Sequence, residues 1–189
     1  MNELKPAVLM LLLFTVICGG FYPLVVTGIA QAVFPKQAEG SFIVDQNGKT
    51  IGSPLIGQPF SDPRYFWPRP SATAGGAYNP LASGGSNAGP TNADYLATVG
   101  ERIKRLRDSG VTGPIPAELV QASASGLDPH LSPAAVLLQV PRVAKVRGMA
   151  EDRLAAFVSF HTEDRQLGCL GDPRVNVLVL NMELDRLQP

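Results

Sequence analysis

The sequence predicts an α+β protein, in which a single N-terminal transmembrane helix precedes one soluble α+β domain with an edge hairpin and long ordered loops. Residues 7–34 carry no charged side chain. At about 1.5 Å per helical residue they exceed the roughly 30 Å of a bilayer's hydrocarbon core. The rest of the 189-residue chain alternates short β-favouring runs with apolar residues at helical spacing. Glycine (19) and proline (17) are frequent, which indicates many loops. We therefore divide the chain into a tail and transmembrane helix, 1–34, and a soluble domain, 35–189.

The apolar run lies between Lys5 and Lys36 and is apolar on every side, as contact with lipid requires. A retained anchor explains it better than a cleaved secretory signal, whose apolar core is shorter, or a buried core helix. Pro23 lies inside the run, so we expect a kink or a break there. A short tail before the helix and a large domain after it favour a cytoplasmic N-terminus and a domain outside.

Small residues within the run are candidates for contacts with other membrane helices. Gly19, Gly20 and Gly28 would let a neighbouring helix approach closely. We therefore predict these three glycines as part of a partner interface.

Charge and cysteine content exclude two classes of protein. The chain carries 16 basic and 16 acidic residues and has no net charge, so nucleic acid is not an expected partner. Cys18 lies in the apolar run and Cys169 far along the domain, so no disulfide framework exists. We expect Cys169 to be a buried, small apolar residue.

The domain is expected to begin with a hairpin and a long loop. Residues 41–44 and 50–56 favour β-structure around Asn47-Gly48, and proline in the second run places the hairpin at a sheet edge. Residues 58–92 are rich in proline but also in aromatic residues, so we expect an ordered loop. Arg64 and Arg69 flank its aromatic cluster. They either stack on the rings or, with Trp67, form a partner-facing anchor.

Three helices are expected after this loop. Thr91 to Asp94 resembles a helix start and is followed by apolar residues at helical spacing and a basic end that we expect to be solvated. Ser132 fits an N-cap, and Pro141 should kink the helix that follows it. A third helix covers 151–160. Residues 175–180 favour a strand, although a helix remains open.

No group of residues in the sequence has the spacing of a known catalytic motif. Asp128, His130 and Ser132 invite comparison with a hydrolase triad, but residues this close in sequence seldom align as nucleophile, base and orienter. Asp128 is better explained as a turn residue. His161 with Glu163 and Asp164 matches no known metal-site spacing. We predict no catalytic residues and no metal site, which favours an accessory subunit over an enzyme.

The glycine-rich stretch 82–87 is ambiguous. Its backbone could cradle a phosphate, or it could form a plain turn.

Several longer segments together are specific to one family. They are Tyr65 to Ala72, Tyr78 to Asn87, Ala122 to His130, Gln139 to Lys145, Gly171 to Val177 and Leu180-Asn181. With the single N-terminal span, they make the whole chain resemble the C subunits of Kdp-type potassium-transporting ATPases.

This resemblance implies a bacterial inner-membrane complex for high-affinity, ATP-driven potassium uptake. It implies three protein partners besides the lipid bilayer, namely a channel-like potassium subunit, a P-type ATPase subunit that hydrolyses ATP, and a small extra subunit. The chain would be a single-pass, non-catalytic subunit with a cytoplasmic N-terminus and a periplasmic domain. The alternative is a membrane-tethered periplasmic enzyme or binding protein that uses Asp128, His130 and Ser132.

The resemblance also implies a role as a catalytic chaperone that raises the ATP affinity of the pump subunit. The chain would have no cofactor of its own but would share an ATP with that subunit through Ser83, Gly84, Gly85 and Ser86. These residues resemble the signature motif of ABC transporters, although Ser86 stands where that motif has glutamine.

Overall fold

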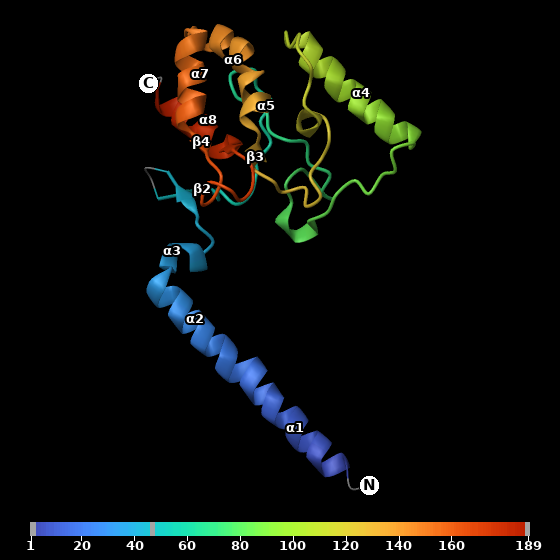
Figure 1. Cartoon of the computed structure of the whole chain (residues 1–189), viewed down its shortest axis with the longest axis vertical. Helices are drawn as coiled ribbons and strands as arrows, with labels where there is room; N and C mark the ends of the chain where they lie inside the picture. Colours follow the sequence, from blue (N-terminus) through green and yellow to red (C-terminus); the bar gives the residue numbers. More distant parts are fainter. Residues whose placement is uncertain (1–2, 46–47, 188–189) are drawn as a thin grey trace. The chain divides into compact units, whose positions relative to one another are not determined.

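The α+β fold is confirmed. The computed structural model describes residues 3–45 and 48–187, and the chain forms two compact units, Met1–Ser53 and Pro54–Pro189. The first unit holds the apolar helix and the hairpin, whereas the second holds a small sheet and most of the helices (Figure 1). The division at residue 34 expected above follows the apolar run, while the units divide after the hairpin.

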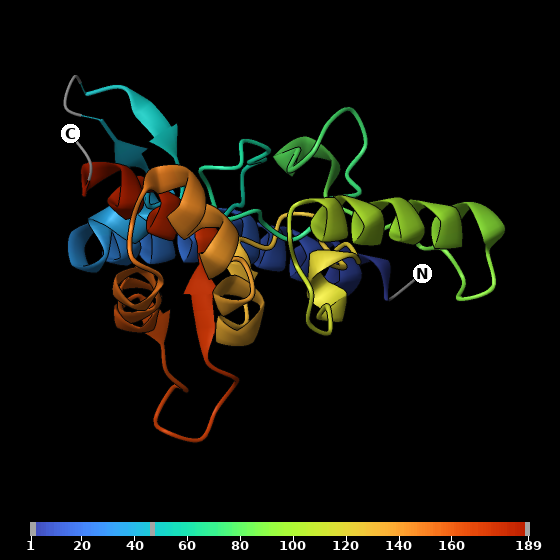
Figure 2. The ribbon, with the colours of Figure 1, turned by 90° about the horizontal axis from the view of Figure 1, so that it is seen from above.

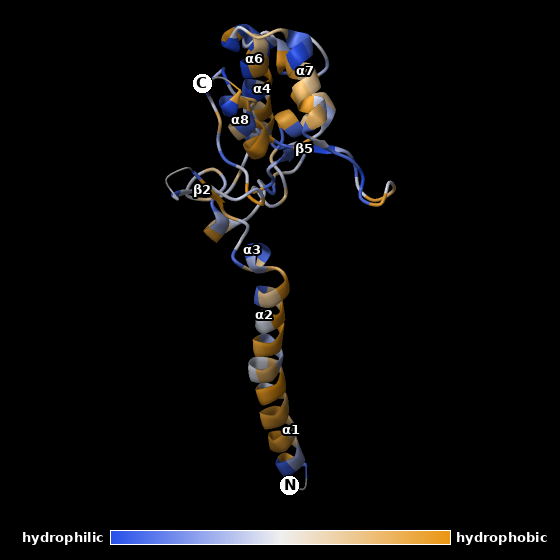
Figure 3. Cartoon of the chain, turned by 90° about the vertical axis from the view of Figure 1, so that its left-hand side faces the viewer, coloured by the Kyte–Doolittle hydropathy of each residue, from blue (hydrophilic) through white to orange (hydrophobic). Residues whose placement is uncertain are grey.

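The first unit begins with one apolar helix from Leu4 to Val33, 30 residues with a mean hydropathy of 2.3. It comprises α1 (Leu4–Val16), a π-helical turn (Ile17–Phe21) and α2 (Tyr22–Val33), and none of its residues is buried. Figure 3 shows that most of this helix is coloured as hydrophobic, with a hydrophilic N-terminal end and a few paler turns. Its length and composition suit a membrane span.

At Pro23, where a kink or a break is expected, the helix is not broken. Pro23 lies in the first turn of α2, and the preceding turn is π-helical, with the amide N–H of Tyr22 donating to the carbonyl of Ile17. The π-helical turn changes the hydrogen-bond pattern from i→i−4 to i→i−5 just before Pro23, which has no N–H to donate. The helix therefore continues through the proline.

The hairpin is confirmed, although its strands are short. After α3 (Pro35–Ala38), β1 (Ile43–Val44) pairs antiparallel with β2 (Thr50–Gly52), so the second strand ends well before residue 56. Asn47 of the predicted turn lies outside the described residues. Gly48 has a φ of +77°, a left-handed conformation that glycine adopts readily.

The second unit is built around a three-stranded antiparallel sheet in the order β3–β5–β4. The strands are β3 (His130–Leu131), β4 (Thr162–Glu163) and β5 (Arg174–Asn176). Four helices stand beside the sheet in Figure 1: α5 (Pro133–Leu137), α6 (Val140–Arg147), α7 (Glu151–Phe160) and α8 (Val177–Arg186). Apolar residues of these helices, of the sheet and of the loop at Phe66 make the core, which includes Phe66, Leu131, Val136, Val143, Leu154, Val158, Val175, Leu180 and Leu184.

The helix starts follow local sequence signals. Ser132 caps α5, because its hydroxyl accepts from the amide of Ala135 at 3.2 Å. The predicted interruption at Pro141 is confirmed, since α5 ends at Leu137 and α6 begins at Val140.

The predicted strand over 175–180 is wrong beyond Asn176. The side chain of Asn176 accepts from the amide of Val179 at 3.1 Å and starts α8 at Val177. An N-cap signal therefore prevails over the β-branched residues that follow it.

Helix α4 (Ala93–Asp108) lies to one side of helices α5 to α8 of the same unit (Figures 1 and 2). Its cap is Asn92, which accepts from the amide of Tyr95 at 3.0 Å, rather than the predicted start at Thr91. The helix is confirmed, but only Leu106 on its apolar face is buried, whereas Leu96 remains 53% exposed.

The basic end of α4 is not simply solvated, as expected from the sequence. Arg102 donates to the carbonyl of Val120 at 2.8 Å, and Arg107 donates to the carbonyls of Val111 and Gly113 at 2.9 and 2.7 Å. These arginines attach α4 to the loop that follows it, because they satisfy carbonyls that no regular element pairs.

Cys169 is exposed rather than buried. It lies in the tight turn closed by backbone hydrogen bonds between Gln166 and Leu170, where Gly168 has a φ of +76°. The turn belongs to a loop that projects from the sheet (Figure 3), so Cys169 has no core to enter.

Candidate functional site

The proline- and aromatic-rich loop of residues 58–92, the aromatic loop, is held by two buried side-chain amides. Asn181 accepts from the amide N–H of Phe66 and donates to its carbonyl, both at 2.9 Å. Gln139 accepts from the amide N–H of Trp67 at 2.8 Å and donates to its carbonyl at 3.1 Å. Each amide therefore takes the place of a neighbouring strand, and together they fix the backbone of residues 66–67.

Trp67 is sandwiched between two guanidinium groups. Arg105 from α4 lies 4.3 Å from the ring centroid and Arg142 from α6 lies 4.0 Å from it. The predicted cation–π stacking is therefore present, but only Arg64 of the two expected arginines stacks, at 5.7 Å from the Tyr65 ring. The arginines that stack on Trp67 come from α4 and α6, which are distant from it in sequence. The periodicity of apolar residues along the chain could therefore not identify them.

Arg142 also holds the loop backbone. Its guanidinium donates to the carbonyls of Pro63 and Tyr65 at 2.6 and 3.0 Å and to the side-chain oxygen of Gln139 at 2.7 Å. Burial, and then the nearby charge of Arg105, lower the pKa of Arg142 to about 10. The Arg142 side chain is buried and forms no ion pair among the described residues, so these oxygen atoms and the Trp67 ring stabilise its charge.

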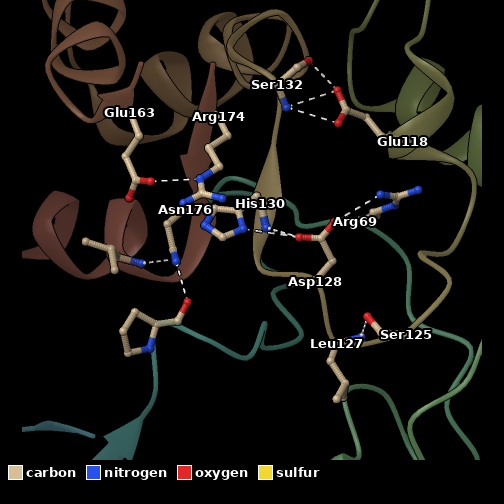
Figure 4. Close-up of polar contacts among 12 residues, drawn as sticks. Arg69, Glu118, Ser125, Leu127, Asp128, His130, Ser132, Glu163, Arg174 and Asn176 are labelled. Atoms are coloured by element: carbon tan, nitrogen blue, oxygen red, sulfur yellow. Dashed lines mark hydrogen bonds and ion pairs between the residues drawn. The ribbon is translucent and has the colours of Figure 1, made fainter. Parts of the chain in front are cut away.

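Arg69 takes part in a polar network instead of a ring contact. Its guanidinium pairs with the Asp128 carboxylate at 3.1 Å, and His130 Nδ1 lies 3.4 Å from the other oxygen of the same carboxylate (Figure 4). Burial would raise the pKa of Asp128, but hydrogen bonds from His130, and then Arg69, hold that pKa below its usual value. The amide N–H of His130 also donates to Asp128 at 3.0 Å, so the predicted turn role of Asp128 is confirmed.

Ser132 belongs to a separate network, as Figure 4 shows. Its hydroxyl donates to the Glu118 carboxylate, and its amide N–H lies 3.1 and 3.2 Å from the two oxygens of that carboxylate. The hydroxyl therefore has Glu118, and not His130, as its acceptor. The geometry does not join Asp128, His130 and Ser132 into a nucleophile, base and orienter.

The glycine-rich stretch packs against residues 123–126. The Ser83 hydroxyl and the Gly84 amide both donate to the carbonyl of Ser125, at 3.0 and 2.9 Å. A Cβ at Gly85 would lie 3.2 Å from the carbonyl oxygen of Ala124. Close packing of the two loops therefore explains the glycine at position 85, whereas a Cβ at Gly84 would meet only the carbonyl oxygen of Ala82, at 3.9 Å.

The remaining candidates are separate from one another. Within residues 3–45 and 48–187, no three acidic, histidine or cysteine side chains are grouped to hold a metal. His161 Nδ1 lies 2.9 Å from the carbonyl of Phe157, and Glu163 pairs with Arg174 at 2.9 Å. A Cβ at Gly19, Gly20 or Gly28 would meet no atom within 4 Å, so these positions leave the surface of the apolar helix open.

Comparison with known proteins decides the family. A family model described as "K+-transporting ATPase, c chain" matches residues 4–186. The "Potassium-transporting ATPase KdpC subunit" of Geobacter metallireducens is 68% identical over 100% of both chains. The protein of that name from Geobacter sulfurreducens is equally similar, and that of Methylococcus capsulatus is 56% identical over 99% of both. The chain belongs to the KdpC family.

Membership of the KdpC family confirms the resemblance drawn from the sequence segments. With one helix long and apolar enough to cross a bilayer, it identifies a membrane protein that is a subunit of a potassium-transporting ATPase. The contacts above also give those segments a physical meaning. Phe66, Trp67 and Arg69 of the first segment bind Asn181, Gln139 and Asp128 of three others.

Proposed function

We propose that this KdpC-family chain is a non-catalytic accessory subunit of a potassium uptake complex. Its apolar helix packs on the channel-like, P-type ATPase and small extra subunits, and its domain lies in the periplasm of a bacterial inner membrane. ATP hydrolysis takes place in the P-type subunit. The observation that carries the proposal is that the polar side chains of the candidate triad are already bound by other side chains of the domain. Asp128 is bound by Arg69 and His130, while Ser132 is bound by Glu118, so each group supports the fold.

The apolar helix supports assembly through the membrane. Gly19 and Gly20 lie in its π-helical turn and Gly28 in α2, and each presents backbone where a side chain would otherwise stand. Small residues allow close helix contact, which is the main source of association between helices in lipid.

Co-purification tests the assembly. A tagged full-length chain is expressed with its partner subunits, and Gly20→Leu and Gly28→Leu are compared with Ala7→Leu, a matched small-to-large change in the same helix. We expect both glycine variants to lower the yield of partner subunits at equal chain levels, and Ala7→Leu to leave it unchanged. A wild-type chain that never co-purifies with them would contradict the proposal.

The side of the membrane is measured separately. Protease added to spheroplasts should digest the domain and leave a protected fragment of the apolar helix. Digestion that occurs only after the membrane is opened would place the domain in the cytoplasm.

The role in ATP affinity is proposed as the resemblance implies it, through a shared ATP at Ser83 to Ser86. Its support is the family, since the contacts of Ser83 and Gly84 are explained by packing on Ser125. The test compares the KM for ATP of the complex with and without this subunit, and maps crosslinks from a photoreactive ATP analogue. A lower KM with a crosslink at residues 83–86 is expected. A lower KM without the crosslink would mean that the subunit raises ATP affinity allosterically, without contacting ATP. An unchanged KM would contradict the role in ATP affinity.

A further inference from the structure

A pocket of about 280 Å³ lies between α4 and the aromatic loop. Its walls include the rings of Phe60, Trp67 and Tyr78, and Arg69, Arg102 and Arg105 also line it. Among the described residues that line it there is no aspartate or glutamate. The pocket therefore combines apolar walls with three positive charges.

Two of these arginines form no ion pair within the described part of the chain. Arg69 pairs with Asp128, but the recorded hydrogen bonds of Arg102 and Arg105 go to the backbone carbonyls of Val120 and Ser61, at 2.8 and 3.4 Å. A neutral carbonyl satisfies a donor without cancelling the charge, so the pocket has a net positive charge in a chain that has none overall.

The surface next to the pocket favours a peptide segment over a small anion. Leu106 of α4 lines the pocket, and the same face of the helix continues to Ile103 and Leu96, which are 38% and 53% exposed. A bare anion would neutralise the arginines but leave the rings and this apolar stripe in water. Arginine, tryptophan and tyrosine are also the residues that dominate protein-binding anchors.

We propose that this arginine–tryptophan pocket binds an acidic segment of another subunit of the complex, with a carboxylate seated on Arg102 and Arg105 and an apolar side chain beside Trp67. Arg102 and Arg105 are three residues apart on one helix, so their guanidinium groups lie on neighbouring turns. The carboxylate forms charge-assisted hydrogen bonds with their remaining N–H groups. The inference rests on the proposed function for the source of the segment, but the binding chemistry can be measured on the chain by itself.

Trp67 provides the measurement, because it is the only tryptophan in the sequence. The full-length chain in detergent micelles is titrated with the blocked peptide acetyl-Phe-Glu-Glu-Phe-amide, and with acetyl-Phe-Gln-Gln-Phe-amide as its uncharged match. We expect a saturable change in tryptophan emission with the acidic peptide, weakened by 0.5 M NaCl and at least about tenfold weaker with the uncharged one.

Variants then locate the site. Arg102→Gln should weaken binding of the acidic peptide at least about tenfold, because it removes one charged partner, and Arg102→Lys should restore part of the loss. Lys104→Gln removes the same charge from the same helix but lies outside the pocket lining, so it should change binding less than about twofold. Arg105→Gln provides a second test if Arg102→Gln disturbs the loop bonded at Val120.

Four results would overturn the inference. They are no saturable change in emission, equal binding of the uncharged peptide, equal binding of acetate or phenyl phosphate, and an equal loss in Lys104→Gln. Equal binding of acetate or phenyl phosphate would assign the pocket to small anions. Failure of the proposed function is a different result, since it appears as the loss of partner subunits in co-purification whatever the peptide does.

Discussion

The buried amide of Gln139 makes the sharpest prediction about stability. Its side chain is completely buried and bonds the amide and carbonyl of Trp67 and the guanidinium of Arg142. Gln139→Leu keeps a similar size but leaves these three polar groups without that partner. At about 1–2 kcal/mol for each of these three unsatisfied groups, the variant should lose about 3–6 kcal/mol of unfolding free energy. Small domains have about 5–15 kcal/mol in total, so the loss is large.

The assay is urea unfolding of the full-length chain in detergent, followed by the emission of Trp67. Asn181→Leu is a second variant, which removes two bonds to Phe66 at 2.9 Å and should cost about 2–4 kcal/mol. Gln121→Leu is the matched control on an exposed position and should stay within about 0.5 kcal/mol of the parent. If Gln139→Leu also stayed within 1 kcal/mol, our account of how the aromatic loop is held would be wrong.

Three further changes test the polar networks and the glycine packing. Gly126 has a φ of +68°, and a Cβ there would lie 2.7 Å from the carbonyl oxygen of Gly84, whereas Gly148 at +64° has open space. Thermal unfolding should therefore show Gly126→Ala about 1–3 kcal/mol less stable than Gly148→Ala, the matched control for backbone strain. The native pKa of Asp128 is lowered, so its ionised form stabilises the fold above about pH 4, and this contribution is lost as pH falls through the native pKa. Asp128→Asn should cost about 1–2 kcal/mol at pH 7, and this cost should decrease as the pH falls from about 4 towards 2. Ser132→Ala removes the cap of α5 and should cost about 0.5–2 kcal/mol in urea unfolding.

Each of these has a clear contrary result. Equal stabilities of Gly126→Ala and Gly148→Ala would show that the loops can separate at no cost. A cost of Asp128→Asn that persists unchanged at pH 2 would mean that shape, and not charge, is what the substitution disturbs. If Ser132→Ala did not change the free energy of unfolding, the start of α5 would depend on Pro133 and on packing rather than on the Ser132 cap.

Sequence reasoning succeeded where the controlling signal is local. Ser132 followed by proline predicted the start of α5, and Pro141 predicted the interruption between α5 and α6. Both depend on which backbone groups can donate within one turn, and that information lies within a few residues. The helix 93–108 and the hairpin were found for the same reason.

The loop-holding amides were missed because their partners are far away in sequence. Gln139 binds Trp67 across 72 positions and Asn181 binds Phe66 across 115. A signal did exist for Gln139, since it stands next to Val140 in a helical pattern whose apolar face is buried. A polar side chain on such a face must find a partner, and the nearest unpaired backbone belonged to the proline-rich loop.

The arginines of α4 show a different limit. Helix-dipole reasoning correctly favours cations in the last turn but treats them as solvated. In the structure, Arg102 and Arg107 donate hydrogen bonds to loop carbonyls, and Arg105 stacks on the Trp67 ring. A long side chain reaches whatever lies within several ångströms, and a one-dimensional pattern does not specify those neighbours.

Three of the segments on which the family resemblance rests contact residues 66–69 through polar side chains. Their polar groups are used to fix Phe66, Trp67 and Arg69 through Asn181, Gln139 and Asp128. A nucleophile or base needs a group that is free to exchange protons or bonds, whereas these groups are committed to holding a loop. Side chains fixed in this way lose little conformational entropy when a partner binds them. The same bonds therefore make the aromatic loop well suited to recognition.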